Sequence, residues 1–214
     1  GKSFYDNGMT FEGAYLDGLD KLGVITWEDS GTLEGELNIS RSDYEISSEI
    51  DLKEVFAIGQ YVRGTITSRG FFNLDDGVFV LTGFGTEFNA DTEAIWSYQA
   101  ANFVNHERKK DQEFLVTKKF NDDSGLAMWG GGINSLLMYA NDEGEKSVLV
   151  FDENGKIDEK IEGWDEASEK EVQRISEVIE EKKSNLDANF ELLDDRLKRL
   201  RNFNPIENGS RTGK

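Results

Sequence analysis

Alternating apolar and polar positions dominate the first part of the chain and predict β-strands. In residues 5–37, apolar side chains fall at every second position on either side of turns that contain glycine, which is the pattern of β-hairpins. Residues 70–74 and 78–81 are two further β-rich runs, and the Asp-Gly turn at 75–77 separates them. Residues 1 to about 88 are therefore predicted to form an antiparallel meander.

Residues 92–109 carry a different pattern. Apolar residues recur at the spacing of a helix, Asp91 or Thr92 can cap its start, and basic residues at 108–110 suit its end. The apolar positions are Ile95, Trp96, Ala100, Phe103 and Val104. This pattern predicts a helix over 92–109 that packs on the sheet. From residue 113 to 161 the β pattern returns, so the predicted β-rich body covers 1–162.

The last 50 residues predict one long helix. Gly163 ends the preceding segment, Asp165 can cap a helix, and no glycine or proline interrupts the chain up to residue 203. A helix of about 38 residues is about 57 Å long, which is longer than we expect the β-rich body to cover. We therefore predict a protruding helix over 163–203, followed by a disordered tail over 204–214.

The apolar positions of this helix are candidates for an interaction face. Their spacing of three and four residues resembles a heptad seam with one stutter, which favours coiled-coil pairing. The opposing interpretation is that the helix folds back onto its own domain. Acidic residues crowd the first half of the helix and basic residues the second, so an antiparallel partner would align opposite charges. The predicted interaction face consists of Val172, Ile175, Ile179, Leu186, Phe190, Leu193, Leu197 and Leu200.

A short unit occurs twice near the start of the chain, with an offset of 22 residues. The first copy contains Phe11-Glu12-Gly13-Ala14-Tyr15, and the second contains Leu33-Glu34-Gly35-Glu36-Leu37. Residues 11–18 resemble the opening of a MORN repeat, which reads aromatic-Glu-Gly-x-aromatic-x-x-Gly. Leu22 and Val24 stand where that family usually has glycines, so the resemblance covers only about residues 5–37. It implies a ribbon of β-hairpins rather than an activity.

Charge and composition exclude several partners. The formal net charge of −19 repels phosphate backbones and anionic lipid surfaces, which disfavours direct binding to nucleic acid or to membranes. Some MORN proteins are credited with phospholipid contact, and this charge argues against the same role here. The chain has no cysteine, and no apolar run approaches the length of a membrane span. We expect a cytoplasmic or virion location.

The sequence offers no convergent catalytic or metal-binding set. His106 is the only histidine, and its charged surroundings favour an exposed residue over a member of a Ser-His-Asp triad. Acidic turns at 75–77 and 121–125 lack EF-hand spacing, so we read them as turns rather than as calcium sites. We therefore expect no catalytic residue, no metal and no cofactor.

Together these patterns predict an α+β protein that is mainly antiparallel β. We expect a non-enzymatic structural or adaptor protein that forms homo-oligomers, or joins a larger assembly such as a phage or virion, through its C-terminal helix. One alternative is an acidic inhibitor that mimics nucleic acid and occupies a basic groove on a host protein. Another is a carbohydrate-binding or carbohydrate-active β domain in which Trp27, Trp96 or Trp129 stacks on sugars.

Overall fold

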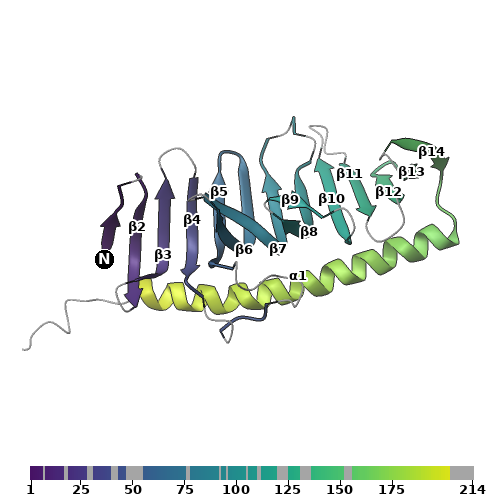
Figure 1. Ribbon diagram of the computed structural model, residues 1–214. Coiled ribbons are helices and arrows are strands. Elements are labelled where there is room, and N and C mark those ends of the chain that lie inside the picture. The colour runs from purple at the N-terminus through teal and green to yellow at the C-terminus, as the bar shows by residue number, and fades with distance from the viewer. Residues whose placement is uncertain are drawn as a thin grey trace, which may run out of the picture.

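A computed structural model describes residues 1–6, 8–16, 19–27, 31–39, 43–46, 55–75, 78–91, 93–94, 96–104, 106–109, 112–119, 125–130, 136–151 and 156–202. Within these ranges, fourteen strands form one antiparallel sheet, and one helix lies along it (Figure 1). The strands are β1 (Lys2–Phe4), β2 (Thr10–Leu16), β3 (Leu19–Trp27), β4 (Gly31–Leu37), β5 (Ala57–Arg63), β6 (Ile66–Asp75), β7 (Val78–Asn89), β8 (Tyr98–Val104), β9 (Glu107–Arg108), β10 (Phe114–Lys119), β11 (Gly125–Gly130), β12 (Leu136–Asn141), β13 (Lys146–Phe151) and β14 (Ile157–Glu162), and the helix is α1 (Glu166–Arg201).

The strands lie side by side in the order of the sequence. Each strand pairs with the next, except that β8 pairs with β10 along one part of its length and with the two-residue strand β9 along another. The predicted antiparallel meander and the α+β class are confirmed. Residues 204–214, for which we predicted a disordered tail, lie outside the described residues.

The predicted helix over 92–109 is wrong, because this segment contributes β8 and β9 to the sheet. Residues 99–103 are all buried, since side chains on both faces of β8 are covered. A strand that is buried on both faces loses the alternation of apolar and polar residues. Apolar residues therefore occur on both faces of β8, and their helix-like spacing does not indicate a helix.

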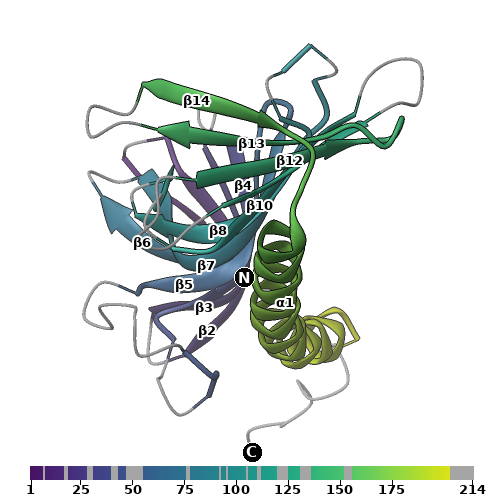
Figure 2. The ribbon, with the colours of Figure 1, turned by 90° about the vertical axis from the view of Figure 1, so that its right-hand side faces the viewer.

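The long C-terminal helix is confirmed, but it does not protrude. Asp165 caps it by accepting a hydrogen bond from the backbone N–H of Ser168, and the helix ends at Arg201, two residues before the predicted end. Its 36 residues span about 54 Å. The thirteen strands in the main order of the sheet span about 58 Å at a spacing of about 4.8 Å. The single sheet is therefore wide enough to support the whole helix, which runs along the row of strands in Figure 1; Figure 2, seen from the β14 end, shows α1 against one face of the sheet.

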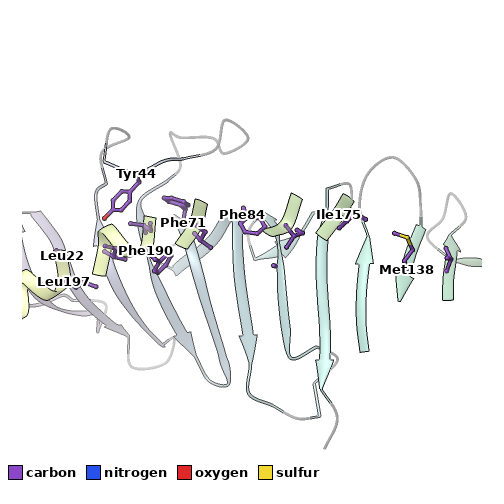
Figure 3. Close-up of a cluster of buried hydrophobic side chains, with 14 residues drawn as sticks. Leu22, Tyr44, Phe71, Phe84, Met138, Ile175, Phe190 and Leu197 are labelled. Carbon is purple, nitrogen blue, oxygen red and sulfur yellow. The ribbon is translucent and has the colours of Figure 1, made fainter. Parts of the chain in front are cut away.

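The two faces of the sheet form two separate hydrophobic clusters. The helix-side cluster joins α1 to one face, with Leu22 and Phe71 near one end and Met138 near the other (Figure 3). The second cluster lies on the opposite face and centres on Phe11, Phe72 and Phe79. The ring of Phe79 lies 5.0 Å from that of Trp27 and 6.4 Å from that of Phe72. Both faces of the first half of the sheet thus carry buried apolar side chains.

A row of glycines crosses the second face. Gly13, Gly23, Gly35, Gly59 and Gly70 are paired in succession across β2 to β6. A Cβ at Gly35 would lie 2.1 Å from the carbonyl oxygen of Ile58, so the backbones approach closely at this row. The glycine of the repeated Glu-Gly unit therefore has a packing role, which is to let neighbouring strands coil tightly.

Candidate interaction surfaces

The predicted interaction face of the helix is turned towards the chain's own sheet. Six of its eight residues are buried in the helix-side cluster, and Val172 and Leu200 are partly buried against it. Burial places these side chains out of reach of a second chain. The expectation that this face binds a partner is therefore corrected: it is the packing face between α1 and the sheet, as the fold-back alternative had it.

Ion pairs join the last turns of the helix to the sheet. A row of paired residues runs along the helix-side face from β1 to β14 and is polar at the β1 end and apolar at the β14 end. Its members are Lys2, Glu12, Val24, Glu34, Gln60, Arg69, Thr86, Ala100, Leu115, Trp129, Met138, Val148 and Ile161. The last turns of α1 lie over the polar end, where Arg196 pairs with Glu36 and Arg201 with Glu34. Basic residues at the end of the helix thus have acidic partners on the chain's own sheet.

Glu36 anchors this end of the helix. Its carboxylate accepts hydrogen bonds from the Tyr44 hydroxyl at 2.6 Å and from Arg196 Nη1 at 2.5 Å, and it lies 3.0 Å from Lys21 Nζ. Burial by itself would raise the pKa of Glu36, but the hydrogen bonds from Tyr44, Lys21 and Arg196 lower it below its ordinary value. The same burial and the bond to Glu36 raise the pKa of Tyr44. Because the carboxylate is 2% exposed and has several donors, it acts as an internal ion-pair centre rather than as a reactive acid.

His106 lies in the turn between β8 and β9, where it is partly buried, and is not exposed on a helix. Its Nε2 is 2.9 Å from the carbonyl oxygen of Phe79, and the backbone N–H of Leu81 donates to Nδ1 at 3.4 Å. Both ring nitrogens therefore contact backbone groups of β7. Ser68 donates its hydroxyl proton to Glu87 at 2.8 Å, and His106 Nδ1 is 4.0 Å from the same carboxylate oxygen. A serine nucleophile requires a hydrogen bond to the histidine, so this cluster does not have the geometry of a catalytic triad.

The tryptophans proposed as sugar platforms are partly buried against the two hydrophobic clusters. Trp27 contacts Phe79 edge to face, and Trp129 contacts Trp164 in the same way at 5.7 Å. Trp96 packs against the second cluster. Each of these rings is at least partly covered, whereas stacking on a sugar needs an open ring face.

Other candidate chemistry is sparse in the described part of the chain. No group of three or more acidic or histidine side chains there could hold a metal ion. Within the same ranges, the model contains no helix with the length and apolar character needed to cross a bilayer. The acidic turn at 121–125 lies outside the described residues except for Gly125, and the turn at 75–77 except for Asp75.

β14 is the surface that differs most from the rest of the sheet. In the main strand order it is the last strand, so among the described elements it pairs only with β13. All six of its residues are exposed, and Ile157 and Ile161 are 60% and 44% exposed. An open hollow of about 630 Å³ lies beside it, lined by Met138, Val148, Ile161 and residues 162–165 together with the first turn of α1. β14 therefore offers unpaired backbone groups next to apolar side chains.

From the sequence, β14 was predicted only as part of the β pattern over residues 113–161. Its position at the edge depends on the order of all the other strands. The available signal was the combination of two isoleucines with charged neighbours in a strand that precedes the long helix.

No protein-family model matches this sequence, and no curated protein is significantly similar to it. The hairpin meander that the MORN resemblance implies is present in the structure. The membership of a repeat family stays a prediction.

Proposed function

We propose that this chain is a non-enzymatic structural or adaptor protein that binds another protein by strand addition at β14. The observation that carries the proposal is the full exposure of β14 at the end of a sheet whose central strands are buried. Strand addition uses the free backbone N–H and C=O groups of an edge strand for affinity, and neighbouring side-chain contacts for specificity.

The helix supports this role indirectly. Because α1 runs along the sheet and contacts β3, β4, β7, β8, β10 and β11, it ties these six strands to one another. A rigid sheet presents its edge in a fixed conformation, so little conformational entropy is lost when a partner strand pairs with it. The helix thus contributes to binding by preorganising the sheet rather than by direct contact.

Site-specific photocrosslinking in the organism's own cells tests this proposal. A photoreactive amino acid at Asp158 or Lys160 lies on the exposed edge, and the same group at Gln173 lies on the exposed side of α1 as a matched control. We expect a discrete protein adduct from positions 158 and 160 and none from position 173. The absence of any protein adduct from the β14 positions, or an equal yield from the control, would contradict the proposal.

A further inference from the structure

A cavity of about 400 Å³ lies between α1 and the sheet, away from β14. The sheet contributes its floor, with Phe71 from β6, Phe84 from β7 and Asn102 from β8. Both phenylalanine side chains belong to the helix-side cluster (Figure 3). Residues 178–189 of α1 form one wall, and residues 45 and 46 form another. A cavity of this volume is in the range of small-molecule sites and is far larger than the space of a single ordered water.

The cavity lies where the apolar stripe of α1 is interrupted. Ile175, Ile179, Leu186 and Phe190 are buried in the helix-side cluster, and the stripe would place a further apolar residue between Ile179 and Leu186. Lys182 stands at that position and is only partly buried. A lysine keeps its charged head near solvent, so no apolar side chain of the helix fills the space above the sheet here. The cavity is therefore a consequence of the helix sequence.

Two asparagines that line the cavity differ in how their amides are satisfied. Asn102 and Asn189 are each 3% exposed. Asn189 Nδ2 donates to the backbone carbonyl of Glu45 at 2.8 Å, and its Oδ1 accepts from the backbone N–H of Glu45 at 2.9 Å. By contrast, Nδ2 of Asn102 has no hydrogen-bond partner in the part of the chain that the structure describes. A buried donor without an acceptor destabilises a fold, so this amide calls for a partner that the chain does not supply.

We infer that the cavity binds a small uncharged molecule with an apolar body and a carbonyl oxygen, and that this oxygen accepts a hydrogen bond from Asn102 Nδ2. Phe71 and Phe84 are buried beside Asn102 and offer ring surfaces to the apolar body of the ligand. A few polar groups in a mainly apolar cavity fix the orientation of a ligand. The site is distinct from β14, so the inference does not depend on strand addition there.

The charges around the cavity favour a neutral ligand. Glu45 and Glu181 are exposed residues of its lining, and Lys182 is the basic residue among the lining residues that the structure describes. Together with the net charge of −19, this excess of carboxylates repels a carboxylate or a phosphate. A cation has no oxygen to accept the proton of Asn102 Nδ2. An uncharged carbonyl compound meets both conditions.

Titration of the full chain with acetophenone, followed by the backbone amide signals in NMR spectra, tests the inference. Acetophenone is a small aromatic ketone, and benzoate is an anion of similar size and shape. We expect acetophenone to shift the signals of residues that line the cavity. Its dissociation constant should be on the order of 1 mM, because so small a molecule makes few contacts. Benzoate should bind at least about tenfold more weakly.

Asn102→Leu removes the donor and keeps a side chain of similar size. We expect it to weaken the binding of acetophenone about fivefold, which is the typical value of one hydrogen bond. In the absence of ligand it should raise Tm, because an unsatisfied polar group is replaced by an apolar one. Asn189→Leu is the matched control for stability and should lower Tm, because it leaves the backbone groups of Glu45 without their partners.

A cavity-filling pair of variants provides a second, independent measurement. Val178 lines the cavity and is partly buried, so Val178→Phe should reduce the space and weaken the binding of acetophenone. Leu192 is 50% exposed and lies outside the lining, so Leu192→Phe should leave the binding unchanged. Circular dichroism of each variant shows whether the fold is retained.

Three outcomes would overturn the inference. The first is the absence of any shift in the cavity residues up to the solubility limit of acetophenone. The second is equal affinity of the wild type and Asn102→Leu for acetophenone. The third is a fall in Tm for Asn102→Leu as large as that for Asn189→Leu, which would show that the Asn102 amide has a structural role. None of these results bears on β14, so the proposed function is tested separately.

Discussion

The central strand β8 and the edge strand β14 differ in their exposure to solvent. Five consecutive residues of β8 are buried, whereas every residue of β14 is exposed. α1 and the second cluster cover the two faces of β8, and neighbouring strands occupy both of its edges. β14 has one neighbouring strand, and beside it the helix leaves an open hollow. The comparison shows that the helix covers the middle of the sheet and leaves the β14 end exposed to solvent.

Removal of α1 should have the largest effect on the folding of the sheet. A chain that ends at Gly163 loses every helix residue of the helix-side cluster, which uncovers Ile58, Phe71 and Phe84. An exposed apolar face of that size causes aggregation or unfolding. We expect the truncated chain to be insoluble or to lack the near-ultraviolet circular dichroism of the full chain. A soluble, folded monomer would show that the sheet does not depend on the helix.

A substitution in the glycine row should have the next largest effect. A Cβ at Gly35 would lie 2.1 Å from the oxygen of Ile58 and 2.7 Å from Cα of Gly59. These neighbours are backbone atoms that cannot rotate away, so we expect Gly35→Ala to lower the free energy of unfolding by about 3 kcal/mol. Chemical denaturation measures this loss.

Gly125→Ala is the matched control in the less covered half of the sheet. Its nearest neighbour is a carboxylate oxygen of Asp142 at 3.2 Å, at the end of a side chain that can move. We expect a loss of less than about 1 kcal/mol for this variant. Equal losses for the two variants would argue against tight coiling at the glycine row.

The ion-pair centre at Glu36 should give a smaller and pH-dependent effect. The pKa of Glu36 is lowered in the folded state, so its contribution to stability is complete above its ordinary pKa of 4.5 and is lost as the pH falls through the lowered value. Glu36→Gln leaves Arg196 and Lys21 without their carboxylate. We expect this variant to lose about 2–3 kcal/mol at neutral pH, less than for a fully buried pair, because both cations reach solvent.

The pH dependence of unfolding separates the contribution of the Glu36 charge from that of its packing. The stability of the wild-type chain should decline more steeply below pH 4.5 than that of Glu36→Gln, because the variant no longer has this titrating carboxyl group. Thermal unfolding at several pH values provides the measurement. Parallel curves would show that Glu36 contributes through shape alone.

Local patterns in the sequence were sufficient for most elements and insufficient for their arrangement. The hairpins and the helix cap at Asp165 depend on neighbouring residues, and these were predicted. β8 was mistaken for a helix because both of its faces are buried, so no polar face marks the alternation. Whether the apolar face of α1 packs on the chain's own sheet depends on the width of that sheet. This width follows only from the pairing of all the strands.

The candidate site was hidden for the same reason. Ile157 and Ile161 look like ordinary strand residues until β14 is placed at the edge of the sheet. Net charge, the lone histidine and the tryptophans, which were visible in the sequence, did not indicate this surface.

Photocrosslinking from the edge strand tests the central claim most directly, because every residue of β14 is exposed and, among the described strands, it pairs only with β13. A photoreactive amino acid at Lys160 should give a discrete protein adduct, whereas the same group at Gln173, on the exposed side of α1, should give none. Equal yields from the two positions, or no adduct from position 160, would contradict strand addition at β14.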